Sequence, residues 1–144
     1  MRKKLEEILE PMLIDLERHV DDRGYLNEIY RSDEFYFTSF GQVYLIDNPR
    51  RGVIRGYHLH KKKDDFWFVV DGSAKVLLKK NNIKKSFVLT YSKPQLLIIP
   101  KGWWHAWMSL EDNTKLINIV SKPFDGKDDY RSPANKKEFE VKIR

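Results

Sequence analysis

Histidine is the residue type in this sequence whose spacing points most directly to chemistry. His58 and His60 are two residues apart within a strand-like segment, and His105 begins another such segment. Residues two apart in a β-strand point to the same face of the strand, so we expect both imidazoles of the pair to enter one pocket. An imidazole titrates near neutral pH and can therefore remove a proton from a substrate without a metal.

A carboxylate follows the histidine pair and opens a second chemistry. Three histidines and one carboxylate can bind a divalent metal such as Fe(II), Mn or Ni, with His58, His60, Asp65 and His105 as the candidate ligands. Asp65, however, ends the stretch 63–65, whose polar residues are typical of an exposed hairpin tip. We therefore favour a solvated loop for Asp65 and a functional role for His58 and His105.

The segments that must position these residues are short and strand-like. Apolar or alternating runs are separated by turn residues, chiefly Pro, Gly, Asn and Asp. These nine runs cover residues 24–31, 41–46, 53–60, 66–70, 74–79, 86–90, 95–99, 105–109 and 115–120. The pattern predicts an all-β sandwich or barrel, such as a double-sheet jelly roll with a concave ligand-binding face. A short helix is expected over residues 3–9, where Pro11 limits its extent.

Length and composition exclude several classes of protein. The 144 residues predict a single domain, with a core over residues 18–122 and an irregular tail over residues 123–144. The absence of cysteine excludes disulfides, thiolate chemistry and cysteine-ligated zinc. No apolar run approaches the ~20 residues of a membrane span. No apolar region follows the basic N-terminal residues, so we expect a cytoplasmic protein.

The net charge of +6 suits an anionic partner, such as a phosphorylated small molecule. The lysines gather in short clusters at residues 61–63, 79–80 and 84–85. We interpret these clusters as solvated hairpin tips and loop edges, where lysine also discourages pairing between sheet edges. Neither a nucleic acid nor a membrane is an expected partner.

Two motifs resemble those of the cupin superfamily, which has a jelly-roll fold. The first motif is His58-x-His60 with Asp65 following, and the second covers residues 100–105 and ends at His105. This resemblance implies that the two motifs lie on facing strands at the mouth of the barrel. It also implies that Asp65 stands where metal-binding cupins usually carry Glu.

Longer stretches, spread over roughly residues 18–133, resemble the dTDP-4-dehydrorhamnose 3,5-epimerase family. The resemblance rests on residues 22–28 (Asp-Arg-Gly-Tyr-Leu-Asn-Glu), 40–42 (Phe-Gly-Gln) and 52–58 (Gly-Val-Ile-Arg-Gly-Tyr-His). It implies an enzyme that removes a proton next to the C4 ketone of a dTDP-linked 4-keto-6-deoxyhexose, without a metal or another cofactor.

The resemblance also implies roles for single residues. His58 matches the family's base, His105 matches a histidine that lines the sugar pocket, and Arg55 matches a residue that holds phosphate or sugar oxygens. The positions that contact the nucleotide, some of them from a neighbouring subunit, are matched by Arg23, Tyr25, Glu28 and Gln42. Family members pair and exchange N-terminal strands, so we expect a homodimer.

A sister family, the dTDP-4-keto-6-deoxyglucose 3,4-ketoisomerases, is similar around the histidine pair. Residues 55–62 (Arg-Gly-Tyr-His-Leu-His-Lys-Lys) and 72–77 (Gly-Ser-Ala-Lys-Val-Leu) resemble the corresponding stretches of that family. This resemblance implies that His58 and His60 act as a pair. Both families remove a proton beside the C4 ketone, and they differ in the carbon to which the proton returns.

The sequence departs from both patterns. Epimerases carry a tyrosine general acid about 13 residues after the pocket histidine, near Asn118 in this chain. They also orient the base with an aspartate from a longer tail, for which Asp125, Asp128 or Asp129 could substitute. The ketoisomerases carry a glutamine where this chain has Asp65.

The leading interpretation is therefore a metal-independent isomerase of a dTDP-4-keto-6-deoxyhexose, epimerase-like in the order of its motifs. A 3,4-ketoisomerase is the first alternative. The others are a metal-dependent cupin and a sugar-binding cupin without catalysis.

Overall fold

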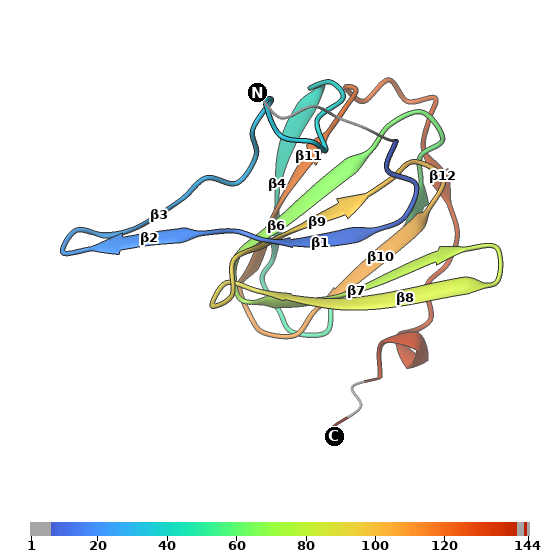
Figure 1. The fold of residues 1–144 in the computed structure, drawn as a ribbon. Coiled ribbons are helices and arrows are strands. Elements are labelled where there is room, and N and C mark those ends of the chain that lie inside the picture. Colours follow the sequence, from blue (N-terminus) through green and yellow to red (C-terminus); the bar gives the residue numbers. More distant parts are fainter. Residues whose placement is uncertain (1–6, 141–142, 144) are drawn as a thin grey trace.

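The protein, described by a computed structural model over residues 7–140 and 143, is built almost entirely of β-strands. The strands are β1 (Met12–Asp15), β2 (Arg18–Asp21), β3 (Gly24–Asn27), β4 (Gln42–Asn48), β5 (Ile54–Leu59), β6 (Asp65–Asp71), β7 (Ser73–Lys80), β8 (Ile83–Thr90), β9 (Gln95–Ile99), β10 (Trp104–Ser109), β11 (Thr114–Val120) and β12 (Tyr130–Arg131). A short 3₁₀ helix, η1, spans Lys136–Phe139 (Figure 1).

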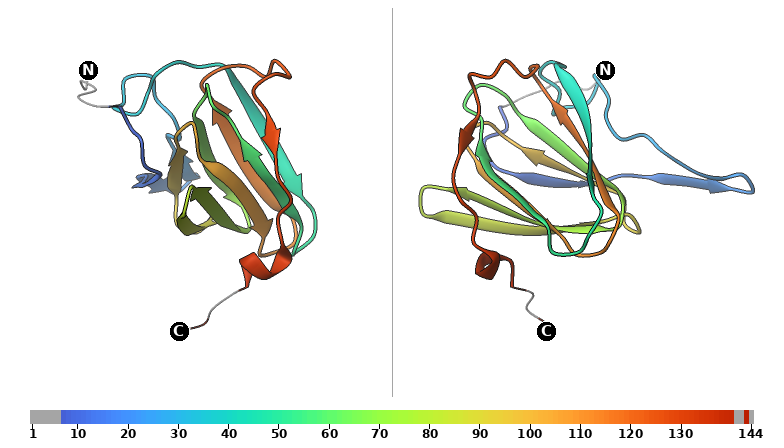
Figure 2. Two further views of the ribbon diagram at one scale, coloured as in Figure 1. Left: turned by 90° about the vertical axis from the view of Figure 1, so that its right-hand side faces the viewer. Right: turned by 180° about the vertical axis from the view of Figure 1, so that it is seen from behind.

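Ten of these strands form two five-stranded sheets that face each other (Figures 1 and 2). The orders are β1-β9-β6-β11-β4 in one sheet and β12-β5-β10-β7-β8 in the other, and the pairings within each are antiparallel. Alternation along the strands turns Trp67, Leu97 and Leu116 of the first sheet toward Val76 and Trp107 of the second, and these side chains form the main core. This double sheet is the predicted jelly roll.

The central strands of the first sheet are buried on both faces, because the loop over residues 28–41 covers their outer side. Phe66, Leu96, Ile98 and Ile119 pack there against Tyr36 of that loop. Residues 65–69 and 95–99 are buried throughout for this reason. The inner face of the sheet is turned toward the second sheet, where its side chains line the core and the cavity.

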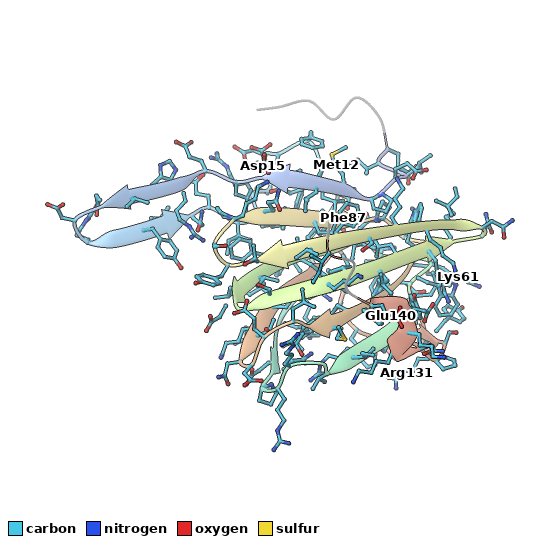
Figure 3. All side chains as sticks on the ribbon, turned by 90° about the horizontal axis from the view of Figure 1, so that it is seen from below. Met12, Asp15, Lys61, Phe87, Arg131 and Glu140 are labelled. Carbon is cyan, nitrogen blue, oxygen red and sulfur yellow. The ribbon has the colours of Figure 1, made fainter. Side chains whose placement is uncertain are left out.

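Strands β2 and β3 form a hairpin that pairs only with itself and extends away from both sheets (Figure 1). Seen from below, this arm continues beyond Asp15 at the end of β1 (Figure 3). Its apolar residues Val20, Tyr25 and Leu26 are 73%, 60% and 59% exposed. An isolated two-stranded hairpin is only marginally stable in water, so we expect the arm to pack against a further surface.

The C-terminal segment runs along the open side of the two sheets and adds β12 to the edge of β5 (Figure 2). The segment then ends in η1, which Asn135 caps through its side chain. Phe139 of η1 is 1% exposed and packs on the outer face of the second sheet with Tyr57 and Ala106. This packing fixes the segment to the sheet at a point beyond β12.

All nine predicted strands are confirmed, with changes of a few residues at their ends. Strands β1, β2 and β12 were not predicted, because each has two to four residues and, unlike β3, none lies within a longer run of strand-like sequence. Of the helix expected over residues 3–9, residues 3–6 lie outside the described residues and residues 7–9 have no regular structure. Within residues 7–140, no helix has the length and apolar character needed to cross a bilayer.

Candidate active site

A cavity of about 530 Å³ lies between the two large sheets, and His58, His60 and His105 line it. Strands β4, β6 and β11 contribute one wall, and β5 and β10 contribute the facing wall. The C-terminal segment completes the rim with Phe124, Asp129 and Arg131. This cavity is the candidate active site.

Gly56 allows β5 to approach β10 at the level of the histidines. The two strands pair with His58 opposite His105, and the register shifts between His105 and Ala106. Gly56 has φ +106°, a conformation that favours glycine, and a Cβ there would lie 2.6 Å from the carbonyl oxygen of His105. The glycine that precedes Tyr57 in the sequence motif is therefore required by backbone packing beside the site.

His58 forms a dyad with a carboxylate of the C-terminal segment. Its Nδ1 lies 3.3 Å from Oδ1 of Asp129, whose Oδ2 accepts from the guanidinium of Arg131. Burial raises the pKa of the Asp129 carboxyl, but the hydrogen bonds from Arg131 and His58 outweigh this effect, so the pKa lies below its usual value. Asp129 therefore remains an anion that can hold the His58 ring in one orientation.

His60 and His105 form a second cluster with Asp65. The ring centroids of the two histidines are 5.2 Å apart, and Nε2 of His60 lies 3.9 Å from Oδ1 of Asp65. Nδ1 of His60 lies 2.6 Å from the carbonyl oxygen of Asp128, and Nδ1 of His105 lies 3.2 Å from that of Trp103. Burial lowers the pKa of His105 to about 4, so this imidazole is neutral at physiological pH.

Asp65 does not lie on an exposed hairpin tip, and that interpretation of the sequence is wrong. It begins β6, is 1% exposed and accepts a hydrogen bond of 2.9 Å from Nδ2 of Asn118 on the neighbouring strand. The other amide atom of Asn118, Oδ1, is buried without a hydrogen-bond partner among the described residues, and so is Nε1 of Trp67 directly opposite on β6. Two buried polar atoms of cavity-lining residues therefore have no hydrogen-bond partner within the described part of the chain.

Tyr44 is a cavity residue that sequence reasoning missed. It lies on β4 opposite Asn118, on the wall that faces the strand of His58. Burial raises the pKa of its phenol, and the charges of Asp65 and Asp129 raise it further. The phenol is therefore protonated at neutral pH. Its place two residues after Gln42 in an alternating strand was the available signal.

Three cations line the cavity: Arg55, Lys63 and Arg131. Arg55 donates from Nε to Oδ1 of Asn48 at 2.7 Å, which leaves its terminal nitrogens free of that bond. Lys63 is 4% exposed, which corrects its assignment to a solvated lysine cluster, and among the described residues it forms no ion pair. The cavity thus offers positive charge to an anionic ligand.

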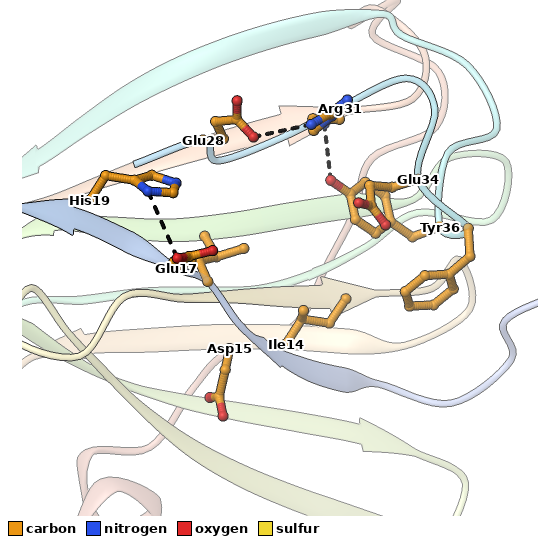
Figure 4. Close-up of a pocket in the computed structure, with 10 residues that line it drawn as sticks. Ile14, Asp15, Glu17, His19, Glu28, Arg31, Glu34 and Tyr36 are labelled. Atoms are coloured by element: carbon orange, nitrogen blue, oxygen red, sulfur yellow. Dashed lines mark hydrogen bonds and ion pairs between the residues drawn. The ribbon is translucent and has the colours of Figure 1, made fainter. Parts of the chain in front are cut away.

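The remaining predicted site residues lie outside the cavity. Arg23 and Tyr25 are on the β2–β3 arm, where Arg23 pairs with Asp21. Glu28 lines a separate pocket of about 360 Å³ and accepts a hydrogen bond from Arg31 (Figure 4). Gln42, at the start of β4, accepts a hydrogen bond of 3.0 Å from the backbone N–H of Phe124. Within one chain these four residues do not meet the histidines.

Known proteins resemble this chain in sequence and fold. The family described as FdtA, WxcM-like, C-terminal, matches residues 10–141. The spore coat polysaccharide biosynthesis protein SpsL of Bacillus subtilis (strain 168) is 34% identical over 128 residues, which cover 82% of this chain and 84% of SpsL. The TDP-4-oxo-6-deoxy-alpha-D-glucose-3,4-oxoisomerase of Aneurinibacillus thermoaerophilus is 27% identical over 135 residues, which cover 94% and 96%.

Among solved structures, the dTDP-4-dehydrorhamnose 3,5-epimerase of Bacillus anthracis str. Ames, with TDP and PPi bound, has a TM-score of 0.82 to this chain. The two are 21% identical, and the match covers 96% of this chain and 88% of that one. At this identity the likeness establishes the fold alone, and it agrees with the predicted jelly roll.

Proposed function

Because the chain belongs to the FdtA family of WxcM-like C-terminal domains, we propose that it is an isomerase of a dTDP-linked 4-keto-6-deoxyhexose. The chemistry is the removal of a proton from a carbon next to the C4 ketone, followed by its return to carbon. A relative that is 27% identical over nearly the whole chain carries the name of an oxoisomerase of such a sugar. The cavity with its histidines and cations suits this substrate.

His58 is the proposed base, and its contact with Asp129 is the observation that carries the proposal. Since Nδ1 of His58 faces the carboxylate, Nε2 is the nitrogen available to take a proton from carbon. The Asp129 anion stabilises the imidazolium that forms, as in other dyads of this type. Asp129 is therefore the proposed residue that orients the base, a role for which the sequence offered Asp125, Asp128 and Asp129.

Tyr44 is the proposed proton donor on the opposite side of the sugar. Epimerisation inverts one carbon, so the proton must leave from one face and return to the other. Tyr44 and His58 belong to the two facing sheets, and the phenol is protonated at neutral pH. A tyrosine on β4 therefore replaces the tyrosine expected near Asn118, which favours epimerisation as the first candidate reaction.

A 3,4-ketoisomerisation is the second candidate, and a different observation favours it. His58 lies in β5 and His60 directly follows the end of that strand, and both line the cavity. Two bases on one wall suit a proton that leaves C3 and returns to C4 on the same face of the sugar. The pair His60 and Asp65 would then carry the second proton transfer.

Arg55, Lys63 and Arg131 are the proposed site for the diphosphate of the substrate. Guanidinium groups match phosphate oxygens in pairs, and a buried lysine without an ion pair gains from an anion. The exposed arm is the proposed dimer contact, through which Arg23 and Tyr25 would reach a second copy of the chain. We expect the enzyme to act in the cytoplasm.

Proton NMR of dTDP-4-keto-6-deoxyglucose in deuterated buffer tests the proposal. Deuterium at C3 and C5 would support the epimerase, and deuterium at C3 with a 3-keto product would support the ketoisomerase. A His58→Ala variant serves as the control and should abolish exchange in either case. Nucleotide-sugar binding without any exchange would contradict both reactions and leave a binding protein.

A further inference from the structure

The cluster of His60, His105 and Asp65 has the composition of a metal site. One ligand atom from each side chain lies within 4.8 Å of those of the other two. In a tetrahedral site with bonds of about 2.0–2.2 Å, ligand atoms lie about 3.3–3.6 Å apart, so closure of the longer distances by about 1–1.5 Å brings all three to one centre. We propose that these three side chains bind a divalent transition metal ion.

The hydrogen bonds of the two imidazoles engage Nδ1 of each ring and leave Nε2 free for a metal. A carbonyl oxygen only accepts, so Nδ1 of His60 donates to Asp128 and Nδ1 of His105 donates to Trp103. The nitrogen of each ring that is left for a metal is therefore Nε2. A metal-bound histidine commonly donates its other N–H to a backbone carbonyl in this way, which fixes both the tautomer and the ring orientation.

Asp65 supplies the negative charge that the site requires. It is 1% exposed, and its hydrogen bond comes from the uncharged amide of Asn118. Lysine and arginine form no ion pair with Asp65 among the residues that the structure describes. A buried carboxylate needs a compensating positive charge, and a metal ion bound with His60 and His105 provides one.

Asn118 gives a second and independent indication. The residue is 8% exposed, its Nδ2 is engaged by Asp65, and its Oδ1 is buried with no hydrogen-bond partner among the described residues. Buried polar atoms usually find a partner. Oδ1 belongs to the same amide group that contacts Asp65, so a water bound to the proposed ion could supply the missing partner.

The geometry separates this site from the proposed base. The fourth ligand expected from the sequence, His58, is not in the cluster, because Asp129 holds its Nδ1 at 3.3 Å. Two imidazoles and one carboxylate suit Zn²⁺, Co²⁺ or Ni²⁺ better than Mg²⁺ or Ca²⁺, which prefer oxygen ligands. The inference does not rest on proton removal by His58, which needs no ligand of this site, whereas a bound metal would exclude the second proton transfer that the ketoisomerase candidate assigns to His60 and Asp65.

Titration of the full-length, tag-free apoprotein with Co²⁺ tests the proposal directly. We expect one Co²⁺ per chain, seen as visible absorption bands of a bound ion, and its displacement by Zn²⁺ in calorimetry. Asp65→Asn and His60→Gln should each weaken binding at least 10-fold. His58→Gln is the matched control, because it removes a histidine two positions away that lines the same cavity, and it should bind as the parent does.

Absence of stoichiometric binding by the parent protein would overturn the proposal, and so would equal loss in His58→Gln and His60→Gln. Binding that persists in both Asp65→Asn and His60→Gln would mean a surface site elsewhere, which also overturns it. Thermal unfolding in EDTA checks that each variant folds. His60→Gln decides the outcome if the buried Asp65→Asn variant does not fold. Hydrogen–deuterium exchange of the sugar in EDTA tests the proposed function separately, and we expect it to continue.

Discussion

Nδ1 of His58 lies 3.3 Å from Oδ1 of Asp129, although the two residues are 71 positions apart in the chain. The histidine comes from a core strand, and the aspartate comes from the C-terminal segment that β12 joins to the edge of that strand. The dyad therefore depends on the docking of a segment whose sequence has no strand-like period. The proposed base becomes complete only when this segment is in place.

Replacement of Asp129 by Asn tests the dyad. We expect the rate of deuterium incorporation into the sugar to fall about 10²- to 10⁴-fold, because the amide no longer stabilises the imidazolium. The affinity for the nucleotide sugar should change little. Asp125→Asn is the matched control in the same segment, since Asp125 is an exposed turn residue. An unchanged rate in Asp129→Asn would contradict the assignment of the base.

Replacement of Tyr44 by Phe removes only the phenol oxygen. We expect epimerisation to slow about 10²-fold or more, because the donor on the second face of the sugar is lost. Deuterium exchange at the carbon from which His58 removes the proton should be less affected, since removal of the proton does not use Tyr44. NMR separates the two by comparing deuterium uptake with the appearance of inverted product. The exposed Tyr91→Phe should behave as the parent protein.

Gly56→Ala tests the close approach of β5 and β10. The new Cβ would lie 2.6 Å from the carbonyl oxygen of His105, in addition to the strain of φ +106°. Gly52→Ala carries a similar backbone strain at φ +83° with open space around the Cβ. We expect Gly52→Ala to lower the free energy of unfolding by about 1–2 kcal/mol and Gly56→Ala to lower it by clearly more. Urea denaturation compares them, and equal losses would remove the steric argument.

Tyr57 predicts a loss of stability at alkaline pH. Burial, together with a smaller contribution from the nearby Glu138 carboxylate, raises its pKa to about 12. The unfolded chain ionises this tyrosine near pH 10 while the folded chain keeps it neutral, so stability falls as pH rises from about 10 to 12. The whole effect is at most about 3 kcal/mol. Urea denaturation at pH 8 and pH 11 should show a smaller pH effect in Tyr57→Phe than in the parent.

The β2–β3 arm predicts self-association. Its exposed apolar residues include Leu26, which is 59% exposed on a hairpin that pairs with neither large sheet. Leu26→Glu should shift the protein from dimer toward monomer in size-exclusion chromatography with light scattering. Ile83→Glu, at the tip of the β7–β8 hairpin on the opposite side of the molecule, should leave the mass unchanged (Figure 1). A monomeric parent protein would contradict the expected homodimer.

The short-range features of this protein could be predicted because they depend on local chain geometry. The period of two in residues 53–60 was enough to put His58 and His60 on one face, and the runs of apolar residues between turns were enough to predict nine strands. The motif that ends at His105 was recognisable by its resemblance to the second cupin motif, which depends on the spacing of a few neighbouring residues. Each of these inferences needs only neighbours within a few positions along the chain.

The contacts that define the site were decided by the tertiary structure. The burial of Asp65 and Lys63, the partner of His58 and the position of Tyr44 on the facing wall all depend on how two sheets close over one another. Asp65 follows two charged residues and resembled a surface turn, but the pairing of β6 with β11 and β9 encloses it. A sequence pattern specifies which way a side chain leaves its own strand, whereas burial depends on what the rest of the chain sets against it.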